Sequence, residues 1–202
     1  FDNYILAFFT NTSFVPAMIE FITLEITYVP AIIIASFILG TLLNRELKFL
    51  EKHLGKYPHK EIFLDKVTQK KDPVYGLSQL PDFVRPFSDI FKTDITLFKI
   101  LTKKYIENTL LLNKRKDYWF LDGLQNYLML EYIQEFYPDT KLLGNLSDRW
   151  FLKSFHISKQ DFNDKYPLVY QFISRRFLDQ ALVTSADSLS NFNRKIANKY
   201  KA

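Results

Sequence analysis

The segment between residues 26 and 44 constrains the fold more than any other part of the sequence, because none of its residues is charged. The run reaches the roughly 18 apolar residues that a membrane-spanning helix needs. It is interrupted by Pro30 and by several small or polar residues, and residues 31–39 are rich in isoleucine, which favours strands. Residues 23–29 alternate partly between apolar and polar side chains and end before Pro30, as a strand followed by a turn does. We therefore predict buried strands here and keep a membrane span as an alternative.

The composition indicates a folded domain rather than disorder. Apolar residues make up 48% of the 202 residues and aromatic residues 17%, with only 5 glycines, so the chain has much to bury and few flexible hinges. This length suits one domain with a sizeable core, or a piece of a larger one. Because Phe1 is not an initiator methionine, we expect a fragment of a longer protein. Residues 1–27 are interpreted as apolar strands of this domain or of a preceding one.

Charge and cysteine content exclude some classes of partner and site. The net charge of +5 arises from 27 basic and 22 acidic residues that are spread along the chain, so we do not expect nucleic acid as a partner. The absence of cysteine excludes disulfides and thiolate metal sites but leaves the cellular compartment open. A membrane is not expected as a partner either, given the predicted strands.

From Asn44 onward, apolar residues recur at spacings of three and four, which predicts helices. The first ends at Gly55, the usual type of C-terminal residue, and the next begins at Ser88, a good N-cap. Helices are predicted at residues 44–54, 88–110, 119–137, 148–155, 165–182 and 188–201, a strand at 61–67 and a long loop at 70–86. The sequence therefore predicts an α+β fold that is mostly helical, with a small N-terminal sheet from its first third.

The sequence shows no motif of a hydrolase or of a phosphate-binding protein. Its histidines are His53, His59 and His156, and no two of them stand four residues apart as in a His-Glu-x-x-His zinc site. There is no Gly-x-Ser-x-Gly elbow and no glycine-rich phosphate loop. We therefore predict no catalytic residue and no metal ligand within this chain.

The segment Trp119–Leu128 resembles the Trp-Leu-Asn-Glu-Gly-x-x-x-Tyr-Leu segment of aminopeptidase N-type gluzincins, which are zinc metallopeptidases. Trp119, Gly123, Tyr127 and Leu128 stand at the positions of the Trp, Gly, Tyr and final Leu of the family's segment. The resemblance places Asp122 at the position of the Glu that is the third zinc ligand. Lys103 and Lys99 then occupy the positions of the two histidines of His-Glu-x-x-His, and Asn108 matches an asparagine that follows this motif.

Two further parts of the chain extend the resemblance, which covers about residues 28–175. Residues 46–58 are similar to the family's helix that ends in Gly-x-x-Tyr-Pro. The family's transition-state tyrosine corresponds to Tyr166 or Tyr170, and the spacing does not decide between them. The family also has a Gly-x-Met-Glu-Asn loop that recognises the free amino terminus of the substrate. At that place this chain has Gly76, Leu77, Ser78, Gln79 and Leu80, of which only the glycine matches.

The resemblance implies a thermolysin-like gluzincin catalytic domain at residues 28–202 that has lost its zinc site. A lysine ammonium has no lone pair for zinc and repels a divalent cation, and the general base of the motif is missing as well. We therefore expect an inactive domain without a cofactor, which binds a peptide or protein segment or acts as a scaffold within a larger parent chain. Lys99 and Lys103 are expected to receive an acidic group in place of the metal.

Three other interpretations remain open. The chain is an active zinc aminopeptidase if its ligands lie outside the recognised motif. It is a membrane-associated helical module if residues 26–44 enter a bilayer. If the resemblance is accidental, the aromatic residues of segment 119–128 are core residues at helical spacing, and lysines 99 and 103 lie on a solvated helix face.

Overall fold

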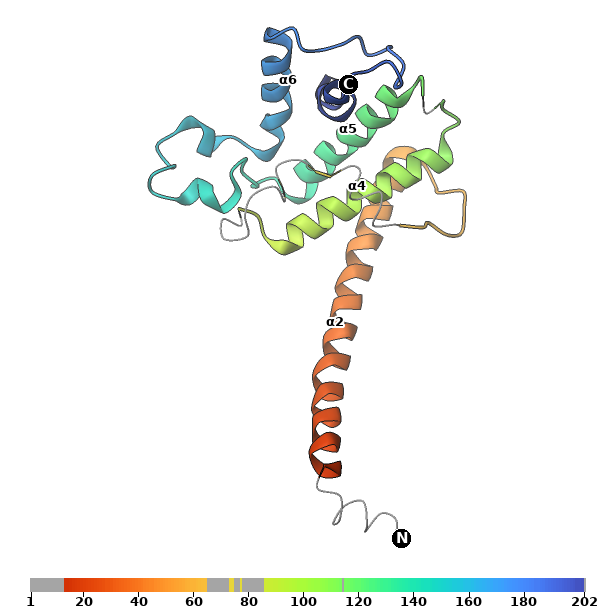
Figure 1. The fold of residues 1–202 in the computed structure, drawn as a ribbon, viewed down its shortest axis with the longest axis vertical. Helices are drawn as coiled ribbons and strands as arrows, with labels where there is room; N and C mark the ends of the chain where they lie inside the picture. Colours follow the sequence, from red (N-terminus) through yellow and green to blue (C-terminus); the bar gives the residue numbers. More distant parts are fainter. Residues whose placement is uncertain (1–12, 65–72, 75–76, 78–85, 114, 202) are drawn as a thin grey trace. The chain divides into compact units, whose positions relative to one another are not determined.

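The computed structural model describes residues 13–64, 73–74, 77, 86–113 and 115–201. Over these residues the chain is mostly helical (Figure 1), which confirms this part of the predicted fold class. The only β pairing among them is an isolated antiparallel bridge between Lys141 and Asp161. The predicted small N-terminal sheet is not found in the described part of the chain, and residues 1–12 lie outside it.

The chain divides into two compact units, residues 1–45 and residues 46–202. The long helix α2, Phe14–Leu54, begins in the first unit and ends in the second. It passes without a break through the domain boundary that was predicted after residue 27. The other described elements belong to the second unit. They are α4 (Asp89–Thr109), α5 (Tyr118–Phe136), α6 (Lys165–Arg175) and α7 (Asn198–Lys201), with short helical turns η1 (Gly144–Asp148), η2 (His156–Lys159), η3 (Phe162–Asp164) and η4 (Asn193–Ala197).

The prediction of strands within residues 14–39 is wrong, because this stretch is part of α2. Pro30 lies inside the helix instead of ending a strand. Isoleucine and threonine lower helix propensity only slightly, so their number does not prevent a helix. The threonine hydroxyls also find partners one turn back, since Thr23 Oγ1 donates to the carbonyl of Ile19 and Thr27 Oγ1 to that of Thr23, each at 2.7 Å.

The core of the second unit forms where the end of α2 meets α4 and α5. The ring of Phe49 lies edge-on to those of Phe98 and Tyr132, with centroids 5.6 and 5.3 Å away, and Phe98 and Tyr132 stack at 4.1 Å. Gly55 ends α2 with a positive φ of 84°, which glycine adopts without strain and which fits the predicted end of this helix.

The boundaries of α4 follow the signals in its sequence. Ser88 caps the helix by accepting a 3.3 Å hydrogen bond from the backbone N–H of Phe91. The predicted apolar stripe of α4 is fully buried: it consists of Ile95, Phe98, Leu101 and Tyr105. The prediction of a helix at residues 88–110 is therefore confirmed, and so is that of the following helix, which is α5.

The C-terminal part contains less helix than predicted. Residues 149–155 form turns rather than a helix, and α6 ends at Arg175 instead of Leu182. Phe177 takes a left-handed conformation with φ 54°, which a helix cannot continue through. The helix predicted at residues 188–201 is only partly confirmed, as a π-helical turn η4 followed by the short α7.

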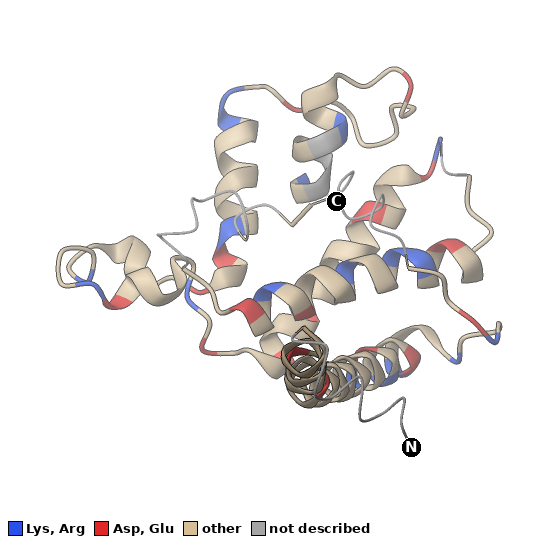
Figure 2. Cartoon of the chain, turned by 60° about the horizontal axis from the view of Figure 1, so that its bottom comes forward, with Lys and Arg blue, Asp and Glu red and all other residues tan. Residues whose placement is uncertain are grey.

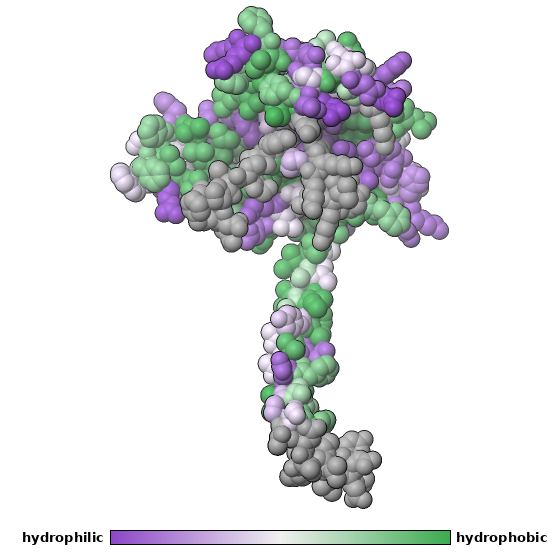
Figure 3. Space-filling view, viewed as in Figure 1, coloured by the Kyte–Doolittle hydropathy of each residue, from purple (hydrophilic) through white to green (hydrophobic). Residues whose placement is uncertain are grey.

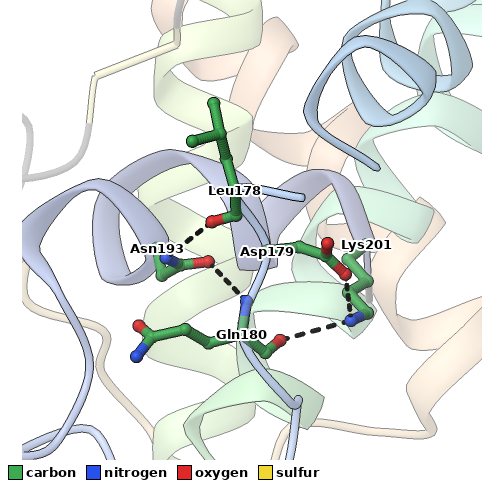
Figure 4. Close-up of polar contacts among 5 residues, drawn as sticks. All are labelled: Leu178, Asp179, Gln180, Asn193 and Lys201. Atoms are coloured by element: carbon green, nitrogen blue, oxygen red, sulfur yellow. Dashed lines mark hydrogen bonds and ion pairs between the residues drawn. The ribbon is translucent and has the colours of Figure 1, made fainter. Parts of the chain in front are cut away.

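Side-chain hydrogen bonds replace the missing helix in this region (Figure 4). Asn193 Nδ2 donates to the carbonyl of Leu178, and its Oδ1 accepts from the backbone N–H of Gln180. Lys201 Nζ lies 2.6 Å from Asp179 Oδ2 and also donates to the carbonyl of Gln180. These contacts attach η4 and α7 to the extended segment after α6.

The strand and loop predicted before α4 cannot be followed in full. Residues 61–64 have no regular secondary structure, and residues 65–67 lie outside the described part of the chain. Most of the predicted loop at residues 70–86 lies outside it as well.

Candidate functional site

Helices α4 and α5 pack side by side in antiparallel directions, and this places the predicted zinc-site positions on facing turns. Gln125 Nε2 of α5 donates a 2.7 Å hydrogen bond to the backbone carbonyl of Lys99 on α4. One turn further along α4, Lys103 lies at the same cavity as Asp122 of α5. The structure thus brings two of the three predicted positions, Lys103 and Asp122, to one site.

The cavity between these helices is small and carries more acidic than basic groups. Its volume is about 130 Å³. Its charged lining residues are Lys103, Glu107 and Asp122, which give a formal sum of −1 from one positive and two negative charges. Tyr118 and Gln125 add polar groups to the wall. This lining suits a cationic group, whereas the sequence led us to expect an acidic one.

Lys99 lies on a neighbouring but separate cavity. Its side chain is buried, and its Nζ donates a 3.1 Å hydrogen bond to the backbone carbonyl of Pro73. The cavity beside it measures only about 20 Å³, enough for about one water molecule. Tyr166 lines this cavity together with Lys99, whereas Tyr170 does not. Of the two candidate tyrosines, Tyr166 is therefore the one that the fold places near a predicted zinc-site position.

A second buried lysine, which the sequence reasoning missed, lies near Lys99. Lys165 is the first residue of α6, and its Nζ is 3.6 Å from the centre of the Phe162 ring and 5.0 Å from that of Tyr166. Burial, and after it the positive charge of Lys99, lowers the pKa of Lys165 from 10.5 to about 7. No spacing rule relates residue 165 to residue 99, so the sequence carries no signal of this proximity.

The predicted peptide-recognition loop is described at one residue only. Leu77 is buried, and its backbone N–H bonds to the carbonyl of Val74, which lines the small cavity beside Lys99. Gly76, Ser78, Gln79 and Leu80 lie outside the described residues.

The histidines do not converge in the described part of the chain. His53 Nδ1 lies 2.9 Å from the carbonyl of Phe49 in its own helix, His59 Nε2 lies 3.4 Å from that of Asn108, and His156 is exposed on η2. Across residues 13–64, 73–74, 77, 86–113 and 115–201, no three histidine, aspartate or glutamate side chains are placed to hold a metal ion.

A larger hollow of about 410 Å³ lies at the start of α4, away from the predicted positions. It is lined by Phe87, Phe91 and Tyr137 and by the charged residues Lys141 and Asp148, among others. Outside this hollow, the lysine and arginine residues of the second unit are distributed over several elements (Figure 2). Sequence reasoning did not single out this hollow, and none of its lining residues is one of the predicted zinc-ligand, loop or tyrosine positions.

Comparison with known proteins gives no relative: no family model, curated protein or solved structure matches the chain. The likeness to aminopeptidase N-type gluzincins therefore depends on the motif residues alone, and it stays a prediction.

Proposed function

We propose that the second unit is a peptide-binding domain without catalytic zinc, descended from an aminopeptidase N-type gluzincin of α+β fold. The observation that carries this proposal is the cavity that Lys103 and Asp122 share. The motif resemblance assigns these two residues to the positions of a zinc-binding histidine and of the third ligand in that family. A domain of this kind would retain the cleft between the two helices after losing the metal.

The side chains at this site explain why zinc chemistry is not expected. Zinc is bound by neutral imidazole nitrogen, thiolate or carboxylate oxygen, and a charged ammonium offers none of these. Of the three family positions, only Asp122 carries a possible ligand, which is too few for a stable four-coordinate site. Lys99 is moreover hydrogen-bonded to the Pro73 carbonyl, so its Nζ already has a structural role.

The ligand that fits the cavity is a peptide with a free amino terminus or a basic side chain. The ammonium group of such a peptide is small enough for about 130 Å³, and the formal charge of the lining favours it. Glu107 and Asp122 would accept charge-assisted hydrogen bonds from the ammonium, and the phenol of Tyr118 lies at the same wall. The remaining peptide would run over the surface of α4 and α5.

Binding can be tested with trialanine amide, which has a free amino terminus, and with its N-acetylated form as the uncharged comparison. We expect the free amine to bind at least tenfold more tightly by calorimetry, and the difference to disappear in Asp122→Asn. Asp148→Asn removes the same charge at the other hollow and should leave binding unchanged. Equal affinities for the two peptides would show that the cavity does not recognise an amine.

Catalysis is tested separately on the purified chain. We expect no stoichiometric zinc by elemental analysis and no turnover of aminoacyl chromogenic substrates. Stoichiometric zinc together with chelator-sensitive turnover would favour the alternative, an active zinc aminopeptidase whose ligands lie outside the recognised motif.

A further inference from the structure

The apolar part of α2 is exposed on every side of the helix. Consecutive residues of an α-helix point about 100° apart, so Ile32, Ile33 and Ile34 face three different directions. They are 62%, 62% and 60% exposed, respectively. Figure 3 shows hydrophobic side chains along the visible face of this helix as well. A helix that is apolar all round is typical of a protein interior or of a membrane span, whereas a helix that docks on one partner surface has a single apolar stripe.

The length of this apolar part matches the thickness of a bilayer. No residue between Glu25 and Arg45 is charged, and at 1.5 Å per residue this stretch covers about 28 Å, close to the roughly 30 Å of the hydrocarbon core. The most apolar window of 18 residues in α2 has a mean hydropathy of 2.2, and none of it is buried by the described residues.

The helical backbone and the threonine hydroxyls of this stretch are compatible with a lipid environment. A continuous helix pairs its backbone groups internally, which is the condition for crossing a bilayer. Pro30 has no N–H for the carbonyl of Ile26, and a single interruption of this kind is tolerated in membrane helices. The hydroxyl of Thr27 donates to the carbonyl of Thr23, and that of Thr41 donates at 2.8 Å to the carbonyl of Ile38. These side chains therefore do not present an unpaired donor to the lipid.

Basic residues gather on one side of this stretch only. Residues 1–25 contain no lysine or arginine. The 16 residues that follow the stretch contain Arg45, Lys48, Lys52, Lys56 and Lys60. Segments that flank a membrane span carry their excess of lysine and arginine on the cytoplasmic side.

We propose that residues 26–44 span a lipid bilayer and anchor the chain, with residue 45 and the second unit on the cytoplasmic side. Two features of the sequence argued against a span. The expected strands are replaced by α2, and the interruption by Pro30 and by small or polar residues does not break this helix. This anchor is independent of the peptide-binding proposal, because it uses none of the residues of the α4–α5 cavity.

Extraction of membranes that contain the full chain tests the span. We expect the chain to stay in the pellet in alkaline carbonate and to dissolve in detergent. The double substitution Ile34→Arg/Phe37→Arg places two charges near the middle of the span and should move most of the protein to the carbonate supernatant. The control Leu111→Arg/Phe151→Arg adds the same charge at exposed apolar residues of the second unit and should stay in the pellet.

Three results would overturn the span. The unchanged chain could appear in the carbonate supernatant, which would mean that α2 is covered by protein or lies on the membrane surface without crossing it. The double-arginine variant could remain in the pellet as fully as its control. The intact mass of the mature chain could lack residues 1–45, which would identify the segment as a cleaved leader.

The orientation can be measured cleanly because the chain has no cysteine. Single cysteines are introduced as Ser13→Cys before the span and Glu61→Cys after it, both at exposed positions. In intact cells, a membrane-impermeant maleimide should label Ser13→Cys alone, and after lysis it should label both. Labelling of Glu61→Cys alone would reverse the orientation, and labelling of both in intact cells would contradict a span.

Discussion

The side-chain amide of Gln125 donates its hydrogen bond to the backbone carbonyl of Lys99, and it thereby fixes α5 to α4 at the turn next to the Lys103–Asp122 cavity. The contact is buried, since only 3% of Gln125 is exposed. It connects the packing of the core directly with the geometry of the candidate site.

Replacing Gln125 with leucine should therefore weaken both the fold and the site. We expect a loss of about 1 kcal/mol in the free energy of unfolding, because the carbonyl of Lys99 still accepts its helical hydrogen bond. This loss can be measured by urea unfolding in mild detergent, with the fluorescence of Trp119 and Trp150 as the signal. Gln134→Leu changes an exposed glutamine of the same helix and should have no comparable effect. Equal losses in the two variants would contradict a role for the buried contact.

The elements that the sequence predicted well are those whose signals are local. Ser88 marks the start of α4, Gly55 the end of α2, and an apolar stripe the buried face of α4, and each of these depends on a few neighbouring residues. The strand prediction for residues 26–44 failed, because an apolar run without clear alternation fits a buried strand and a helix equally well.

Long-range relationships were predictable only in part. The resemblance led us to compare Lys103 with Asp122, and the structure places both at one cavity, but it gave no sign that Glu107 would change the charge of that cavity. Likewise, the burial of Lys165 beside Phe162 depends on how η3 and α6 pack on the rest of the unit. Spacing along the chain does not encode such packing.

The lowered pKa of Lys165 should make stability depend on pH. The pKa of Lys165 is about 7 in the folded chain and 10.5 in an unfolded chain, so between these pH values the unfolded chain binds more protons. Stability then rises with pH across this window, and the full penalty for burying the ammonium is present below pH 7. We expect Lys165→Met to be more stable than the unchanged chain at pH 6, by a few kcal/mol.

The gain from Lys165→Met should shrink as the pH approaches 10, where the lysine of the unchanged chain is neutral when folded. Urea unfolding at pH 6, 8 and 10 gives the difference between the two proteins, and Lys153→Met at an exposed position serves as the control. A difference that does not vary with pH would mean that Lys165 keeps an ordinary pKa in the folded chain.

A buried carboxylate holds α4 to the end of α5. Asp94 is fully buried and accepts hydrogen bonds from the hydroxyl of Tyr132 at 3.1 Å and from that of Tyr137 at 2.7 Å. Tyr137→Phe removes the shorter of these bonds, and because the acceptor is a carboxylate we expect a loss of about 1.5–3 kcal/mol in the free energy of unfolding. Tyr127→Phe, at a residue that is 55% exposed, should be neutral in the same urea titration.

Alanine substitutions at two glycines with positive φ allow the cost of backbone strain to be distinguished from the cost of a steric clash. Gly55 and Gly144 have φ values of 84° and 51°, where a side chain is unfavourable by about 1–2 kcal/mol. A Cβ at Gly55 would meet nothing within 4 Å, whereas one at Gly144 would lie 2.0 Å from the backbone oxygen of Pro86. That oxygen cannot move away easily, because it accepts a 2.6 Å hydrogen bond from the N–H of Asn145.

Gly55→Ala should therefore lower the free energy of unfolding by about 1–2 kcal/mol, whereas Gly144→Ala should lower it further, by about 1–3 kcal/mol more, because the backbone around Pro86 has to shift. Urea unfolding of both variants under the same conditions gives the two values. The difference between them measures how closely η1 approaches the start of α4, where the larger hollow lies. Equal losses would mean that Gly144 is required only for its backbone conformation and that the close approach to Pro86 can relax at no cost.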